Sequence, residues 1–126
     1  MSKSALRRFA AMAVLAGAIG CASHRIADPR IVIDPSASSI VKVLTVDYGE
    51  TKGANPVVSL SLQSTSGHTR HIEYRTVWLG ANGAAIDSAL SIWKPVTIDP
   101  REVADLKSVS PRSDVTGFRI EIRKAR

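Results

Sequence analysis

The sequence predicts an all-β protein, an immunoglobulin-like β-sandwich of about seven short antiparallel strands. Short β-branched and apolar stretches recur along the chain with turn residues between them, and no strong helical period follows residue 21. Residues 21–126 number 106, close to the roughly 100 residues of an immunoglobulin-type domain. With one Cys in 126 residues, an intramolecular disulfide, a CxxC redox pair and a Cys-cluster metal site are excluded.

The first twenty residues have the composition of an export signal. Lys3, Arg7 and Arg8 precede an uncharged apolar run over residues 9–19. This run is shorter than the roughly 20 residues of a membrane-spanning helix. A buried amphipathic helix would carry polar residues at helical spacing in the run, and it carries none. We therefore expect residues 1–20 to be a signal-peptide helix that is removed after export.

The end of this segment, Ala18-Ile19-Gly20-Cys21, resembles the lipobox of bacterial lipoproteins, although Leu is more usual at the position of Ala18. The resemblance implies that Cys21 becomes the new N-terminus, carrying diacylglycerol and an N-acyl chain, with no other cofactor. Two or three acyl chains anchor a protein stably, whereas one holds it reversibly. Residue 22 is Ala rather than Asp, which, by resemblance to enterobacterial sorting, favours the outer membrane. The alternative is a plain secretory signal with a fortuitous Cys.

Residues 21–38 are predicted to be the lipidated N-terminus and a flexible tether, followed by the sandwich domain over residues 39–126. Two Asp-Pro pairs and a run of small polar residues give this stretch its linker character. The apolar triplet at residues 31–33 leaves open a short edge strand inside it.

The remaining strands follow from their patterns in chain order. Residues 40–46 are rich in β-branched side chains, and residues 58–63 alternate apolar and polar side chains. Residues 71–79 alternate between a face with Ile72, Tyr74, Thr76 and Trp78 and a face with Glu73, Arg75, Val77 and Leu79. Weaker strands are expected at 96–98 and 103–109, and the most regular one-sided strand at 118–123.

Turn residues separate these strands. Residues 49–55, 64–69 and 80–83 contain Gly or Asn, and Pro100 and Pro111 mark two further turns. The segment 86–92 fits either a strand or a helical turn. Burial of aromatic and aliphatic side chains alone must then close the domain, because no disulfide is available.

The net charge of +6 suggests nucleic-acid binding until the signal is set aside. Three of the 17 Lys and Arg residues lie in residues 1–20, so residues 21–126 carry 14 basic and 11 acidic side chains, a net charge of +3. The remaining cations are interspersed with acidic residues and form no block with interleaved aromatics. We therefore expect no nucleic-acid partner.

The sequence offers no catalytic or metal-binding constellation that we can assemble. His68 and His71 are three apart, which in a strand places the rings on opposite faces, so we expect solvated turn residues and no metal site. No Gly-x-Ser-x-Gly motif or phosphate-binding loop is present. The prediction is that the protein is not an enzyme.

Two tryptophans and two arginines are the remaining candidates. Trp78 is expected in the core, as in other sandwich folds. Trp93 packs at the rim or offers a flat surface to a glycan or protein. Arg119 and Arg123 share a solvated strand face with Glu121 and could meet an acidic partner. Trp93, Arg119 and Arg123 are therefore the candidate partner surface.

The motif Tyr74-Arg75-x-x-Trp78-Leu79, followed by a Gly turn, Trp93 and the strand at 118–123, resembles the YcfL family of small bacterial lipoproteins. The resemblance covers about residues 40–123. The sequence departs from the family pattern at Thr76, where an aromatic or aliphatic residue is usual, and at Gly80, where Asp is common. The resemblance implies an immunoglobulin-like sandwich on the periplasmic side of the outer membrane and an accessory envelope role, with no catalytic residues to carry over.

These observations predict a lipid-anchored periplasmic binding or accessory module of the cell envelope, without catalysis, that docks an envelope protein. The alternative is a binder of peptidoglycan or lipopolysaccharide that uses Trp93 and the surface cations.

Overall fold

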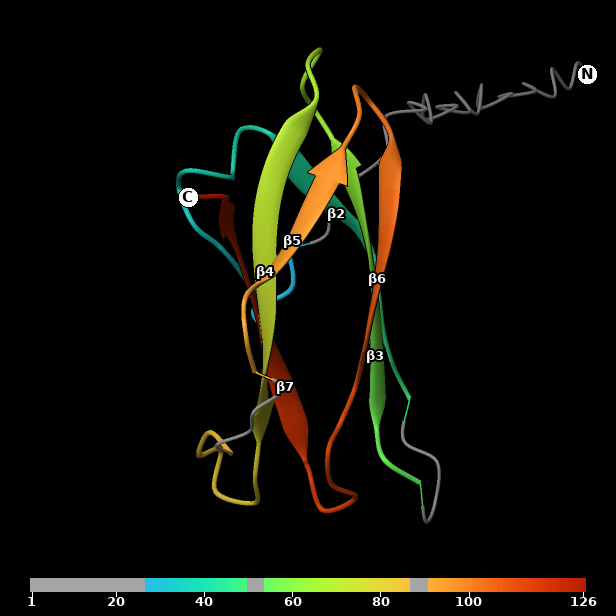
Figure 1. Ribbon diagram of the computed structural model, residues 1–126. Helices are drawn as coiled ribbons and strands as arrows, with labels where there is room; N and C mark the ends of the chain where they lie inside the picture. Colours follow the sequence, from blue (N-terminus) through green and yellow to red (C-terminus); the bar gives the residue numbers. More distant parts are fainter. Residues whose placement is uncertain (1–26, 50–53, 87–90) are drawn as a thin grey trace, which may run out of the picture.

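The computed structural model describes residues 27–49, 54–86 and 91–126 and places seven strands in two sheets. One sheet has the order β1-β7-β4-β5 and the other the order β2-β3-β6. Figure 1 shows β4, β5 and β7 in one layer, facing β3 and β6 in the other. The strands are β1 (Ile31–Ile33), β2 (Val41–Gly49), β3 (Val57–Ser64), β4 (Arg70–Leu79), β5 (Lys94–Ile98), β6 (Val103–Val109) and β7 (Gly117–Lys124).

The strand pairing is that of an immunoglobulin-type sandwich. β3 pairs with β6 and β4 pairs with β7, as strands B and E and strands C and F do in that fold. β2 takes the place of strand A beside β3, and β5 forms a hairpin partner of β4. The predicted all-β sandwich is confirmed.

The N-terminal strand β1 corrects two details of the prediction. It pairs in parallel with β7, at the place where strand G would lie beside F, so the strands are not all antiparallel. Two backbone hydrogen bonds flank the pairing, from Ile120 N–H to Arg30 O (2.9 Å) and from Asp34 N–H to Ile122 O (2.8 Å). The folded domain therefore begins before residue 39, and the tether predicted for residues 21–38 does not extend through β1. Ala37, which is fully buried, also belongs to the domain.

Alternation along the strands builds one core between the sheets. Inward-facing side chains of β3, β4 and β7 bury their apolar surface here, and each fully buried Leu, Ile or Phe contributes roughly 1.5–3 kcal/mol. Trp78 is 1% exposed, which confirms its predicted core position. The largest fully buried side chains are Trp78, Phe118, Leu60, Leu62, Ile72, Ile98, Ile120 and Ile122.

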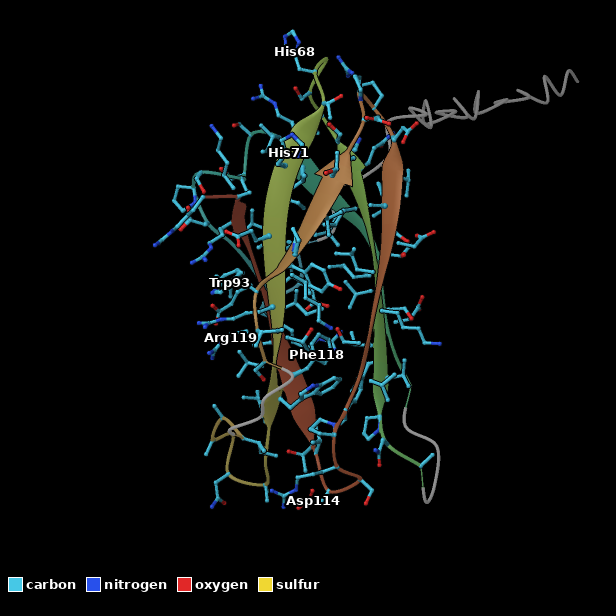
Figure 2. All side chains as sticks on the ribbon, in the orientation of Figure 1. His68, His71, Trp93, Asp114, Phe118 and Arg119 are labelled. Atoms are coloured by element: carbon cyan, nitrogen blue, oxygen red, sulfur yellow. The ribbon has the colours of Figure 1, made fainter. Side chains whose placement is uncertain are left out.

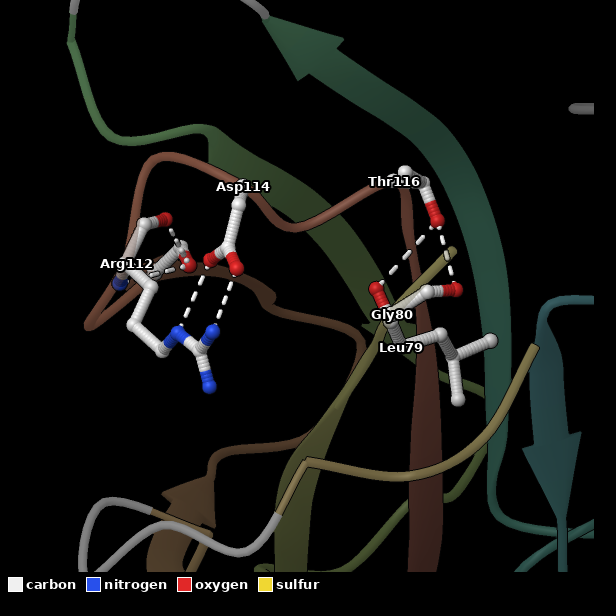
Figure 3. Close-up of polar contacts among 6 residues, drawn as sticks. Leu79, Gly80, Arg112, Asp114 and Thr116 are labelled. Carbon is white, nitrogen blue, oxygen red and sulfur yellow. Dashed lines mark hydrogen bonds and ion pairs between the residues drawn. The ribbon is translucent and has the colours of Figure 1, made fainter. Parts of the chain in front are cut away.

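One end of the sandwich is closed by the turn after β4 and the loop before β7 (Figure 3). The Thr116 hydroxyl donates to the carbonyl oxygens of Gly80 (2.8 Å) and Leu79 (3.4 Å), which joins the two connections. In the same loop the Arg112 guanidinium forms an ion pair with Asp114. Gly83 has φ of +72°, so the predicted Gly turn is present.

Two connections differ in detail from the sequence pattern. In the turn that precedes β6, Arg101 adopts φ of +64°, a left-handed conformation that residue type did not predict. The described residues of the ambiguous segment 86–92 lie in neither helix nor strand, and residues 87–90 lie outside the described part. In the described ranges, no helix has the length and apolar character needed to cross a bilayer.

Candidate functional site

The outer face of the four-stranded sheet carries a ladder of arginines and glutamates. Because β4 and β7 are antiparallel neighbours, Glu73 lies opposite Arg123 and Arg75 lies opposite Glu121. Val77 lies opposite Arg119 at the next outward position. These side chains alternate with the core residues of the same strands, so sequence pattern and register together create the face.

Ion pairs hold this ladder in place. One carboxylate oxygen of Glu121 forms an ion pair with Arg75 (2.8 Å), and the other forms an ion pair with Arg119 (3.2 Å). Glu73 forms an ion pair with the Nε of Arg123 (3.1 Å). The glutamates are 18–19% exposed, whereas the Arg119 side chain is 44% exposed. The acidic groups are thus held against the sheet, and cationic groups form much of its accessible surface.

Trp93, immediately before β5, lies over this ladder. The guanidinium carbon of Arg123 lies 3.7 Å from the indole centroid, and that of Arg75 lies 4.8 Å from it. Contacts of this kind contribute about 0.5–1 kcal/mol each at an exposed site. Trp93 is half-buried, and Figure 2 shows it on the same side of the molecule as Arg119. The stacked arginines therefore fix the position of the indole on the sheet face.

A hollow of about 260 Å³ lies beside Trp93, between the ends of β1 and β7. Trp93, Val32 and Pro35 contribute apolar groups to its lining, and Arg123 and Arg126 contribute cations. We call it the Trp93 hollow. Its full lining is Val32, Ile33, Asp34, Pro35, Trp93, Glu121, Ile122, Arg123 and Arg126.

Asp34 is the exposed acid of the Trp93 hollow. Hydrogen bonding from Ser36 lowers the pKa of this carboxyl, and the charges of Arg123 and Arg126 lower it further. The Ser36 backbone N–H donates to Asp34 Oδ1 at 2.9 Å. Asp34 is therefore a carboxylate at neutral pH and partly offsets the positive charge of the two arginines.

The structure brings together the three residues proposed as a partner surface, Trp93, Arg119 and Arg123. Arg75 and Val32 were missed because only the strand register places them beside these three. Cys21, the proposed lipidation site, lies outside the described residues.

The two histidines are separate from this face. His68 is exposed in the turn before β4, and both side chains lie near one end of the sandwich in Figure 2. His71 is exposed on β4, with Nδ1 3.1 Å from the Thr97 hydroxyl. Within the described ranges, no three His, Cys, Asp or Glu side chains gather as metal ligands would.

The family model described as "Protein of unknown function (DUF1425)" matches residues 29–124. The chain belongs to the DUF1425 family. The match begins two residues before β1, in agreement with the earlier start of the folded domain.

Two solved structures share the fold of this DUF1425 chain. A DUF1425 family member from Shewanella sp. pv-4 is 19% identical with a TM-score of 0.61, over 68% of this chain and 79% of that chain. Cj0090 from Campylobacter jejuni is 15% identical with a TM-score of 0.65, over 78% of this chain and all of that chain. No curated protein matches the sequence.

Proposed function

We propose that this DUF1425 protein is a lipid-anchored binding module on the periplasmic face of the outer membrane. It docks an envelope protein through the outer face of the β1-β7-β4-β5 sheet and acts by binding rather than catalysis. The observation that carries the proposal is the convergence of Trp93, Arg119 and Arg123 on one accessible face. Tryptophan and arginine are the residue types most enriched at protein–protein hot spots.

The anchor and the compartment rest on the N-terminal sequence. The basic and apolar composition of residues 1–20 and the lipobox-like sequence before Cys21 support export and acylation. The resemblance of the sequence to YcfL-like lipoproteins supports the same location. In this proposal, diacylglycerol and an N-acyl chain on Cys21 attach the protein to the membrane.

The charges of the face indicate an acidic partner surface. Three arginines and two glutamates form the ladder, and Arg126 and Asp34 add one charge of each sign at its edge, so one positive charge remains. Complementary charge accelerates association and orients the partner, whereas the stacked indole supplies apolar area. The opposite sheet has a different outer surface, on which the β3 positions are Val57, Ser59, Ser61 and Gln63.

Site-specific photocrosslinking in intact cells tests this assignment. A photoreactive amino acid in place of Arg119 should capture one envelope protein, and the same group in place of Lys107, on the opposite sheet, should not. Trp93→Ala in the Arg119-substituted chain should reduce the product severalfold. Equal capture from both positions, or no product at near-native expression, contradicts the proposal.

Glycan binding is the second candidate, because Trp93 combines a half-buried aromatic ring with adjacent cations. Peptidoglycan or the sugar-phosphate part of lipopolysaccharide would then replace the protein partner. Cosedimentation with purified sacculi, or with lipopolysaccharide aggregates, separates the two candidates. Retention that Trp93→Ala weakens favours the glycan, and no retention removes it.

A further inference from the structure

We infer that the Trp93 hollow is a subsite for a carboxylate side chain that lies next to an apolar side chain in an acidic segment of the partner protein. The inference rests on the proposed docking function and names the chemistry that one part of the docking face recognises. It involves Arg126, Val32, Pro35 and Asp34, which lie outside the surface indicated by the sequence.

The first argument is the supply of unused donors. Arg123 donates to Glu73 through Nε, and its two terminal nitrogens have no hydrogen-bond partner among the described residues. The Arg126 guanidinium likewise has no ion-pair or hydrogen-bond partner in the described part of the chain, although its backbone N–H donates to Glu73 (3.2 Å). Both arginines line the Trp93 hollow. A guanidinium presents parallel N–H groups that match the two oxygens of a carboxylate.

The second argument is that the acids of the ladder already have cationic or N–H partners. Glu121 is paired with Arg75 and Arg119 through both of its oxygens, and Glu73 accepts from Arg123 Nε and from the backbone N–H of Arg126, both at Oε1. These acids hold their partners in place while leaving the outer nitrogens of Arg123 unused. With Asp34 counted, the ladder and the Trp93 hollow together keep one positive charge, and the unpaired guanidinium nitrogens lie at the hollow.

The third argument is the apolar wall beside these donors. Val32 is 45% exposed on β1, one of the few large apolar side chains accessible in the described residues. Pro35 and the Trp93 ring also line the hollow. Removing such surface from water is favourable, so an apolar side chain next to the carboxylate adds affinity. The combination selects an acidic residue with an apolar neighbour over an isolated charge.

Asp34 determines the direction in which the Asp34→Asn variant should change ligand affinity. Its carboxylate lies at the same hollow and interacts electrostatically with Arg123 and Arg126, but it forms no ion pair with either. A ligand carboxylate is therefore repelled by Asp34, so removal of the Asp34 charge should strengthen its binding. The apolar wall of Val32, Pro35 and Trp93, which phosphate cannot use, favours a peptide carboxylate with an apolar neighbour over the phosphate of a glycolipid.

The test is a titration of the full chain, purified in detergent, with acetyl-Leu-Glu-amide, acetyl-Leu-Gln-amide and inorganic phosphate. Nuclear magnetic resonance of the two indole N–H groups gives the readout, with buried Trp78 as internal reference. The Glu peptide should shift the Trp93 signal saturably, and the Gln peptide should bind at least tenfold more weakly, because a charge-assisted hydrogen bond is lost.

Three variants locate the site. Arg126→Gln should weaken binding of the Glu peptide about tenfold, and Asp34→Asn should strengthen it severalfold. Arg112→Gln, at an exposed ion pair outside the hollow, should leave it unchanged. Equal binding of both peptides, no effect of Arg126→Gln, or saturation by phosphate at lower concentration overturns the inference.

The two proposals can fail separately. Crosslinking from position 119 without selective binding of the Glu peptide overturns the carboxylate subsite and leaves the docking function standing. Selective peptide binding without a crosslinked partner supports the subsite and counts against the docking function in cells.

Discussion

At the scale of single residues, Thr76 shows why a polar side chain can occupy a core position. Thr76 is 5% exposed between the sheets, and its hydroxyl lies 2.7 Å from that of Ser108 on β6. The sequence identified Thr76 as a departure from the YcfL-like pattern, and the structure gives the compensating partner. Each hydroxyl satisfies the other across the core.

This pair leads to a prediction of non-additivity. Thr76→Val should lower the free energy of unfolding by about 1–3 kcal/mol, because it leaves the buried Ser108 hydroxyl without its partner. Ser108→Ala should have a similar effect, and the double variant should lose less than the sum of the two. Urea denaturation measures all three. Simple additivity would show that the hydroxyls are not coupled.

The residues of the proposed docking face show the limit of sequence reasoning at this scale. Arg119 and Arg123 could be placed on one face because they alternate with core residues of a single strand. Trp93 could not be placed, because it lies outside any strand and its position depends on Arg75 and Arg123 from two other elements. Arg126 lies beyond the end of β7, so no strand alternation predicts its position.

At the scale of elements, β1 is the strand that sequence reasoning left undecided. It has three residues between two Asp-Pro pairs, and its partner β7 lies almost ninety positions later. A pairing with so distant a strand leaves no pattern in the nearby sequence that predicts it, whereas each longer strand shows its own alternation of apolar and polar side chains. The strands that pack most of the core were therefore predictable, and the one that completes the sheet edge was not.

Electrostatics beside β1 gives a prediction about pH. Asp28 accepts hydrogen bonds from Arg30 Nε (3.0 Å) and backbone N–H (2.9 Å), and the Arg30 guanidinium lies over the Phe118 ring. The hydrogen bond from the Arg30 side chain lowers the pKa of Asp28 below its ordinary 3.8. The Asp28 carboxylate therefore stabilises the folded state above the unfolded pKa, and this stabilisation is lost as pH falls through the lower folded pKa.

We expect Asp28→Asn to be less stable than the parent at pH 6 and to lose less stability on acidification. Urea denaturation at pH 6 and in the acid range below pH 3.8 measures the difference between the two proteins. Lys107→Gln, an exposed change on β6 that leaves β1 and its partners intact, serves as the control for general acid effects. An identical pH dependence in Asp28→Asn and the parent would show that Asp28 does not contribute.

At the scale of the whole molecule, alternation and turn residues were sufficient to predict two packed sheets, because each strand must bury one face. They could not predict which outward faces become adjacent, since this depends on the pairing of β4 with β7. The candidate site is a product of that pairing. The charge of +3 on residues 21–126 gave no indication that arginines gather on one sheet and uncharged side chains on the outer face of β3.

The proposed anchor limits where such a face can work. Cys21 precedes the first described residue, Ala27, by six positions, so an extended connection reaches at most about 20 Å. A partner bound to the outer face of the β1-β7-β4-β5 sheet would then lie close to the inner surface of the outer membrane. The short connection favours a partner that is itself membrane-associated or that passes close to the bilayer.

Attachment and folding should accordingly be separable. Cys21→Ser should abolish fatty-acid labelling and release the chain from the outer-membrane fraction or leave it unprocessed, because the sulfur proposed to carry diacylglycerol is missing. Its unfolding midpoint should match that of the parent, since residue 21 precedes the folded strands by ten positions. Ala22→Ser, beside the same site, should retain both label and location. Unchanged labelling of Cys21→Ser would refute the anchor without affecting the proposed docking face, which is tested by crosslinking from position 119 and by Trp93→Ala.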